Sequence, residues 1–391
     1  MKLLFKLAAK NLIGAGLRTW LNVIVLSFSF IIIIWHKVLL DGLDRQAKNE
    51  TTSWETGGGQ YWQVTYDPYD PFSLTEAHAR IPSAFDTCVS KGDLAPILIT
   101  QGTIYPGGRI KSILLKGIDS RQKVLKIPSS LFSKSNDEIP ALIGTKLATD
   151  NEIKEGDLIT LRWRNIHGTF DAGEMKVIGI FDTNVPSVDV GQVWVPLDRL
   201  QKMMDMQGEA TIIVRKNVKS AIPEVDGWKF QSSEVLLKSI TDMIKMKSVS
   251  GAVLYLILLS LAMLAIFDTQ VLSIFRRQKE IGTYIALGMT RRQVVGLFTI
   301  EGSLNSILAG ILAAIYGIPL LAYQASHGMS IPGGSRNFGL AMADKIFPSY
   351  SIGLVVTTVL LIMLTTTIVS YLPSRKIAKM KQTEALRGKL Q

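Results

Sequence analysis

The residues best suited to act on another molecule are bases that flank a short segment between two long apolar runs. These bases are Arg276, Arg277, Lys279, Arg291 and Arg292, and a single acid, Glu280, accompanies them. Bases gathered beside an apolar run are typical of the cytoplasmic side of a membrane. The pattern therefore predicts a positively charged segment that docks another protein at the membrane surface.

The segment between the two groups of bases is helical by composition, from Glu280 to Leu287. Gly288 can end this helix, because glycine adopts the left-handed conformation that closes a helix at low cost. Thr290 together with Gln293 has the spacing of a capping box for a following helix. We therefore expect a short helix that lies on the membrane surface between two spans.

The sequence lacks the residue patterns expected for metal binding, nucleotide binding or catalysis. The four histidines have no zinc-type spacing, and Cys88 is the single cysteine, so an intrachain disulfide is impossible and a metal site is not expected. No nucleotide-binding GxxxxGK[ST] loop occurs, and no nucleophile and base are paired in a recognisable motif. We expect no catalytic residue in this chain, and no cofactor or metal bound by it.

Four apolar runs are long enough to cross about 30 Å of hydrocarbon at 1.5 Å per residue. They are residues 21–40, 249–275, 294–323 and 352–372. The expected fold is an α-helical membrane protein with four transmembrane helices and a large α+β extracytoplasmic domain, residues 41–248, inserted between the first and second spans. The first run is too long for a cleavable signal core, so we expect it to stay as an anchor.

Charge sets the expected orientation. Three segments carry 15 bases against two acids: an amphipathic interfacial helix at 1–20, the loop at 276–293 and the tail at 373–391. Residues 41–248 carry 25 bases and 27 acids. The net charge of +11 therefore lies on one side, which predicts cytoplasmic termini and an outside location for 41–248 and for the loop at 324–351. A nucleic-acid partner is not expected.

The outer region alternates strand and turn signals. Strands are expected at 61–66, 96–100, 112–118, 158–163, 175–181, 192–197 and 211–215, and short helices at 145–151 and 197–207. We expect two lobes, Trp54 to Pro140 and Ala141 to Val218. Residues 232–247 predict a helix that continues into the second span without a breaker and forms a rigid stalk.

Small residues recur every four positions in the third span, at Gly302, Ser306, Gly310 and Ala314. Such spacing lets helices approach closely in lipid, although small residues also scatter along spans by chance. Two acids lie in or near the spans. Asp268 is a functional candidate because a charge within a membrane is costly. Alternatively, its side chain extends toward Arg276 or Arg277, or it pairs across a helix interface. Glu301 lies close enough to the cytoplasmic end to contact the bases of the linker.

Several motifs resemble those of the FtsX/MacB-like ABC transporter permeases. They are "EIG" at 280–282, "ALG" at 286–288, Arg291-Arg292, Glu301-Gly302, the start "LAAKNLIGAGLRTWLNVI", the tail "YLPSRKIAKMKQTEALRGKL" and two outer segments at 142–161 and 177–201. The layout is most similar to lipoprotein-releasing permeases of the LolC/LolE type. The N-terminal sequence departs from that type, and the fused ATPase of MacB is absent from these residues.

The resemblance implies the roles of the linker residues and the partners. Glu280, Ile281, Gly282, Ala286, Leu287, Gly288, Arg291 and Arg292 would couple the chain to a cytoplasmic ABC ATPase, present in two copies, which binds the ATP and Mg. A second permease copy or paralogue, membrane lipids and a periplasmic carrier or adaptor would complete the assembly in the bacterial inner membrane. Motion of the stalks, called mechanotransmission, would drive the outer domains.

Three functions fit this pattern. The first is release or transport of lipoproteins or other lipid-anchored cargo from the inner membrane. The second is MacB-like export of peptides, toxins or drugs from the periplasm. The third is FtsX-like signalling across the membrane to a periplasmic hydrolase.

Overall fold

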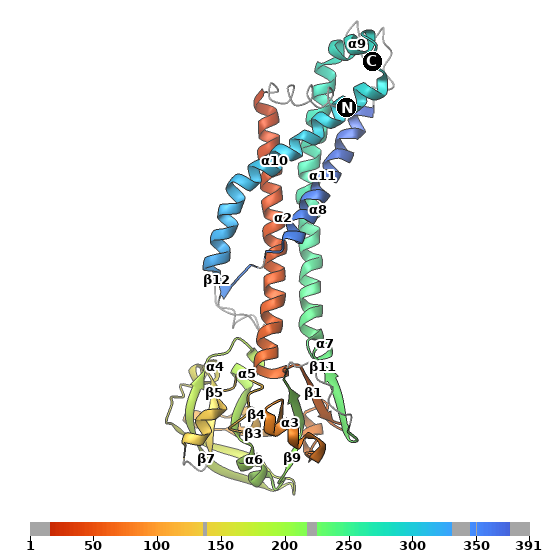
Figure 1. Cartoon of the computed structure of the whole chain (residues 1–391). Coiled ribbons are helices and arrows are strands. Elements are labelled where there is room, and N and C mark those ends of the chain that lie inside the picture. The colour runs from red at the N-terminus through yellow and green to blue at the C-terminus, as the bar shows by residue number, and fades with distance from the viewer. Residues whose placement is uncertain (1–15, 136–138, 217–224, 331–344, 349, 376–391) are drawn as a thin grey trace. The chain divides into compact units, whose positions relative to one another are not determined.

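The computed structural model describes residues 16–135, 139–216, 225–330, 345–348 and 350–375 (Figure 1). The chain divides into two compact units. One unit contains residues 1–43, 244–329 and 347–391, and holds the long helices. The other contains residues 44–243 and 330–346, and holds the sheet. The predicted helix at 1–20 and tail at 373–391 lie largely outside the described residues.

Four helices of the described residues are long and apolar enough to cross a membrane, as expected. They are α2 (Gly16–Thr51), α8 (Lys238–Arg276), α10 (Arg291–His327) and α11 (Ile352–Ser374). Helix α2 extends well beyond the predicted span at 21–40, and α10 extends three to four residues beyond each end of the span at 294–323, whereas α8 starts before 249 because it includes most of the stalk predicted at 232–247. The reason is that hydropathy detects only the part of a helix that suits hydrocarbon, whereas a helix continues until a breaker or cap stops it.

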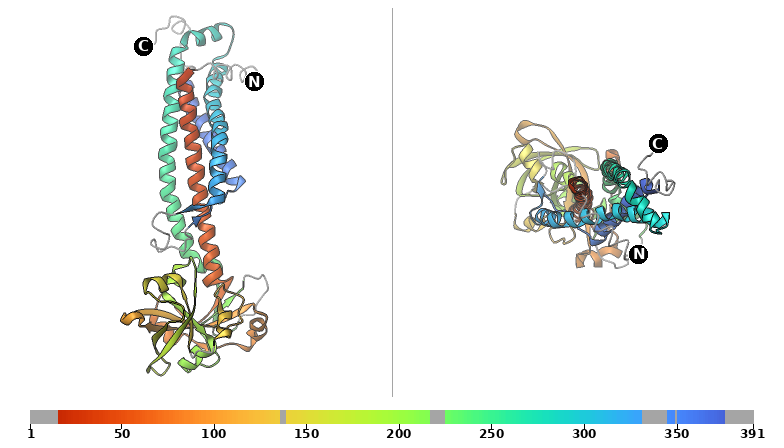
Figure 2. Two further views of the ribbon diagram at one scale, coloured as in Figure 1. Left: turned by 90° about the vertical axis from the view of Figure 1, so that its left-hand side faces the viewer. Right: turned by 90° about the horizontal axis from the view of Figure 1, so that it is seen from above.

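An apolar core holds the four helices together. Phe30 of α2, Ile266 of α8, Ala309 of α10 and Ile362 of α11 are each at most 2% exposed and belong to one cluster. Figure 2 shows α2 in red, α8 in green and α10 in light blue running alongside one another. Their outward surfaces remain apolar, since large residues such as Leu256 and Ile315 are 67% exposed, as helices that contact lipid require.

Nine strands form one mixed sheet in the other unit, in the order β11-β1-β10-β3-β4-β8-β5-β7-β6. Their bounds are β1 Gly59–Gln63, β3 Leu94–Ile104, β4 Lys111–Ile118, β5 Pro140–Gly144, β6 Leu158–Arg164, β7 Phe170–Phe181, β8 Gln192–Pro196, β10 Ile212–Arg215 and β11 Trp228–Ser232. The pairs β4–β8 and β5–β7 are parallel, and the other pairs are antiparallel.

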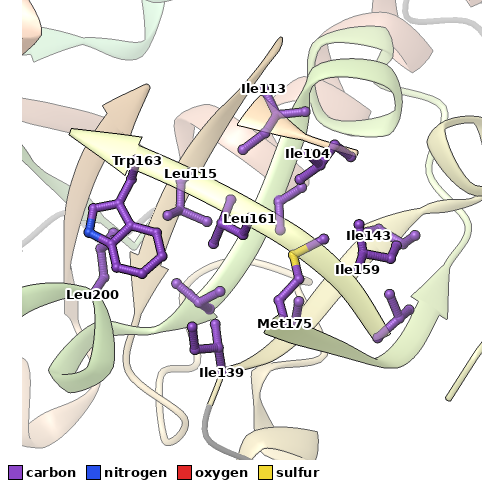
Figure 3. Close-up of a cluster of buried hydrophobic side chains, with 14 of the residues drawn as sticks. Ile104, Ile113, Leu115, Ile139, Ile143, Ile159, Leu161, Trp163, Met175 and Leu200 are labelled. Carbon is purple, nitrogen blue, oxygen red and sulfur yellow. The ribbon is translucent and has the colours of Figure 1, made fainter. Parts of the chain in front are cut away.

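Part of this sheet closes on itself. The end strand β6 pairs with β3 as well as with β7, through the register Gly102 with Trp163. The strands β3, β4, β8, β5, β7 and β6 therefore form a small closed barrel around buried side chains. Figure 3 shows Leu115, Leu161 and Met175 directed toward one another in this core, and each is fully buried.

The short elements complete the sheet unit. The helices are α3 Asp86–Lys91, α4 Thr145–Asp150, α5 Pro186–Gly191, α6 Leu197–Met204 and α7 Ser233–Leu236. A two-stranded pair joins β2 (Ala79–Arg80) to β9 (Glu209–Ala210), and another joins β12 (Met329–Ser330) to β13 (Lys345–Ile346). The seven predicted strands and two predicted helices are all confirmed, whereas β5 and β11 were not predicted.

The prediction of two lobes is wrong. Strand β4, from the first expected lobe, pairs with β8 from the second, and β5 lies between β8 and β7. A division of the sequence at residue 140 therefore cuts through one continuous sheet. The reason is that pairing between strands distant in sequence leaves no local pattern along the chain.

Candidate functional site

The candidate site is the helix α9, Gln278–Ala286, which lies between α8 and α10 in the sequence. Gly288 follows it with φ +97°, a conformation that favours glycine, and the amide of Met289 bonds back to the carbonyl of Tyr284. Thr290 then caps α10 through a capping box with Gln293. The short helix, its glycine stop and the next cap are confirmed as predicted.

The inner face of α9 is anchored by apolar contacts. Ile281 is fully buried and packs with Val294 and Phe298 of α10 and with Ile274 of α8. Gly282 beside it is also buried. Burying a side chain the size of isoleucine contributes about 1.5–3 kcal/mol, so Ile281 holds α9 firmly against the ends of both long helices.

A charged cluster fixes the beginning of α9. The Arg277 guanidinium donates through Nη1 to both carboxylate oxygens of Glu301 at 3.0 Å, and through Nε to Glu280 at 2.7 Å. It also lies over the ring of Phe298, with 5.0 Å from Cζ to the ring centre. Burial alone lowers the pKa of Arg277, but Glu301 and Glu280 more than offset this, so the pKa is raised and the group stays charged.

The outer face of α9 is open. Leu287 is 79% exposed, and Lys279, Ala286 and Gly288 are exposed beside it. Arg276, Arg291 and Arg292, at the adjoining helix ends, are exposed as well. The surface therefore presents an apolar side chain among positive charges. Large exposed apolar residues next to a structured surface are typical of contact sites.

The eight predicted coupling residues differ in exposure and fall into three groups. Ile281 and Gly282 face inward, and Glu280 holds Arg277 while its side chain is 54% exposed. Ala286, Leu287, Gly288, Arg291 and Arg292 are exposed and form the accessible surface. The sequence analysis did not single out Arg277, since nothing distinguishes it from its neighbouring bases until the position of Glu301 is known.

The contact between Glu301 and a linker base is confirmed, and that base is Arg277. The side chain of Asp268 points outward on α8 and is exposed. Within the described residues its carboxylate makes no hydrogen bond or ion pair, so the alternative pairing with Arg276 or Arg277 is not observed. Asp268 remains a candidate intramembrane charge.

The small residues of α10 that pack against other helices follow the helical repeat of 3.6 residues and not a strict spacing of four. A Cβ at Gly302 would collide with Ser370 of α11, and Ser306 is 1% exposed. Beyond them the packed face continues through Ala309, Ala313 and Gly317, whereas Ala314 is exposed and a Cβ at Gly310 would meet open space. A step of four residues turns about 40° past a full turn, so a spacing of four leaves the face after two steps.

Among the described residues, no group of three or more His, Cys, Asp or Glu side chains lies close enough to hold a metal ion.

Comparison with known proteins gives a family-model match for the region that contains α9. Residues 252–382 match the model of the FtsX-like permease C-terminal domain, which includes most of α8 and all of α9, α10 and α11. The chain is 24% identical over 280 residues to an uncharacterized ABC transporter permease of Methanocaldococcus jannaschii, covering 67% of this chain and 65% of that relative.

Among solved structures, the chain is similar to the extracellular domain of the noncanonic ABC-type transporter YknZ from Gram-positive bacteria. That similarity has a TM-score of 0.26 and 14% identity, and it covers 42% of this chain and 83% of the other.

Proposed function

Because residues 252–382 match the FtsX-like permease C-terminal domain, we propose that this chain is the membrane subunit of an ABC transporter driven by a separate ATPase. In this proposal two ATPase subunits dock on α9 from the cytoplasm, and the chain pairs with a second permease copy or a paralogue. The ATPase subunits bind the ATP and Mg, and the permease itself catalyses no reaction.

The observation that carries the proposal is the structure of α9. Its inner face is fixed by Ile281 and by the Arg277–Glu301 ion pair, while its outer face exposes Leu287 among bases. A docked partner can transmit force only through an element that does not yield. A helix anchored by both apolar and charged contacts meets this condition, so displacement of α9 moves the ends of α8 and α10.

The helix α8 gives that displacement a path. It has 39 residues from Lys238 to Arg276, which corresponds to about 58 Å at the rise of an α-helix. Leu237, the residue between α7 and α8, departs from helical backbone geometry. The amide of Thr241 nevertheless bonds to the carbonyl of Leu237. We infer mechanotransmission, in which motion of α9 passes along α8 toward the sheet-bearing unit outside the membrane.

The cargo we propose is a lipoprotein or another lipid-anchored molecule of the inner membrane, which a periplasmic carrier or adaptor would accept. This assignment follows the presence of an outer domain of about 200 residues between the first and second apolar helices. Both termini would be cytoplasmic, in agreement with the charge distribution of the sequence.

Docking on α9 can be tested by adding one negative charge to its exposed surface. Leu287→Glu places an acid at the centre of the exposed face without disturbing a packed contact. We expect loss of co-purification of the ATPase and loss of its stimulation by the permease in lipid nanodiscs. Gly288→Glu is a poorer probe, because a side chain at φ +97° also strains the turn.

The matched control is Val64→Glu, the same change at a 63% exposed valine in the sheet unit. This variant should bind and stimulate the ATPase as the wild type does. If Leu287→Glu also binds normally, the ATPase docks elsewhere and the proposed role of α9 is wrong.

A further inference from the structure

A cavity of about 730 Å³ lies within the sheet unit, a volume typical of sites for small organic ligands. Its walls are largely apolar and include Trp62, Ile99, Ile212 and Ile240. Strands β1, β3 and β10 supply the first three of these residues, and the beginning of α8 supplies the fourth. The cavity uses none of the residues of α9.

Glu55 forms one part of its polar floor, and its oxygens are already used. Oε2 accepts a hydrogen bond from the Ser187 hydroxyl at 2.7 Å, and Oε1 accepts one from Gln192 Nε2 at 3.0 Å. The Lys116 ammonium lies 3.8 Å from Oε1, which makes an ion pair but exceeds hydrogen-bond distance. Glu55 therefore has little capacity left for a ligand that donates hydrogen bonds.

Lys116 forms the second part of the polar floor, and the N–H groups of its ammonium make no hydrogen bond to a described residue. It projects from the central strand β4, is 6% exposed, and lies 5.3 Å from the ring centre of Trp194. Within the described residues, no acceptor lies within hydrogen-bond distance of its ammonium. An ammonium has three donors, and leaving them unmet in a buried position is costly. Burial lowers the pKa of Lys116, against the opposing effect of Glu55.

Tyr66 adds a second donor at the same place. It lines the cavity, and burial, Glu55 and Asp67 raise its pKa to about 12, so its hydroxyl stays protonated. No described residue forms a hydrogen bond with this hydroxyl. The floor therefore offers two unused donors, and the buried Thr51 hydroxyl, which also lines the cavity and has no hydrogen-bond partner among the described residues, can supply a third.

We propose that this cavity binds an amphipathic monocarboxylate, with its carboxylate on Lys116 and Tyr66 and its apolar body against Trp62, Ile99 and Ile212. A single negative charge suits the floor, because Glu55 already balances much of the charge of Lys116 and would repel a dianion such as phosphate. An ammonium–carboxylate hydrogen bond is stronger than a neutral one, which favours a carboxylate over an uncharged carbonyl group. This site is independent of ATPase docking.

The test uses the full chain in lipid nanodiscs and the fluorescent monocarboxylate 11-(dansylamino)undecanoate. We expect saturable binding with a blue shift of the emission by the wild type. The matched control Lys111→Met lies on the same strand but does not line the cavity, and it should bind equally. Lys116→Met should bind at least tenfold more weakly, and the corresponding carboxamide probe should bind the wild type at least tenfold more weakly than the carboxylate does.

Tyr66→Phe removes only a hydroxyl, so it keeps the proposal testable if Lys116→Met does not fold, and it should weaken binding several-fold. Val235→Trp fills the mouth of the cavity from an exposed position and should also weaken binding. The proposal is overturned if the wild type shows no saturable binding, if folded Lys116→Met binds as the wild type does, or if the carboxamide binds equally well.

Discussion

Breaking the ion pair between Arg277 and Glu301 should destabilise the helical unit, and replacing both residues should not. In Arg277→Met the carboxylate of Glu301, whose side chain is 8% exposed, loses its ion pair with the Arg277 guanidinium. Removing one partner of a buried pair costs about 3–5 kcal/mol. The Arg277 side chain is 18% exposed, so water relieves part of this cost and we expect a value of about 3 kcal/mol.

The double variant Arg277→Met with Glu301→Leu removes both charges and keeps similar apolar volume. Apolar replacement of a whole buried pair is often neutral, so its stability should lie within about 1 kcal/mol of the wild type. The assay is equilibrium unfolding in mixed micelles for the wild type, the two single variants and the double variant, analysed as a double-mutant cycle. The coupling energy should be at least about 2 kcal/mol, because Arg277→Met alone costs about 3 kcal/mol and the double variant at most about 1 kcal/mol.

A second measurement separates packing from function. Because Ile281 still anchors α9 in the double variant, we expect that variant to retain most of its stimulation of the ATPase. Additive effects of the two single substitutions would refute the reasoning, since they would show that Arg277 and Glu301 do not stabilise each other.

The remaining predictions concern coupling, orientation and pH. Lys247→Pro interrupts α8 in its interior at a cost of about 3 kcal/mol or more, so cargo release should fall while ATPase binding persists; Lys247→Ala is the control, and full release by the proline variant would contradict a rigid rod. In a Cys88→Ser background, an impermeant thiol reagent should label Ser133→Cys but not Thr383→Cys in intact cells, and the reverse pattern would overturn the proposed orientation. Tyr66 has its pKa raised to about 12 in the folded chain, so its contribution to stability is complete below pH 10 and is lost as the pH rises to about 12. The loss should be at most about 3 kcal/mol, and alkaline unfolding of Tyr66→Phe should show a smaller fall; an equal fall would contradict the raised pKa.

Local patterns in the sequence predict the elements that depend on nearby residues. Hydropathy alone is sufficient to predict the four apolar helices, since each helix is apolar over many turns. Gly288 and the pair Thr290–Gln293 are sufficient for the end of α9 and the beginning of α10, because a stop and a cap use residues within one turn.

Features that depend on distant residues could not be predicted in this way. The partner of Glu301 had to be chosen among several bases, and only the fold brings Arg277 to it. The pairing of β4 with β8 joins residues about 80 positions apart and merges the expected lobes. Lys116 reads as an ordinary strand residue in the sequence, and its burial beside Glu55 appears only when the sheet is assembled.

The most direct test of the central claim is cross-linking from the outer face of α9. The single native cysteine permits a Cys88→Ser background that carries Leu287→Cys, with Val64→Cys as the control. A photoactivatable thiol reagent is attached, the full chain is irradiated in membranes of its own host, and the product is identified by mass spectrometry. We predict that Leu287→Cys cross-links to an ABC ATPase subunit, that Val64→Cys does not, and that ATP changes the yield. An ATPase cross-link from neither position, or an equal one from both, would contradict the assignment of α9 as the site where the permease is driven.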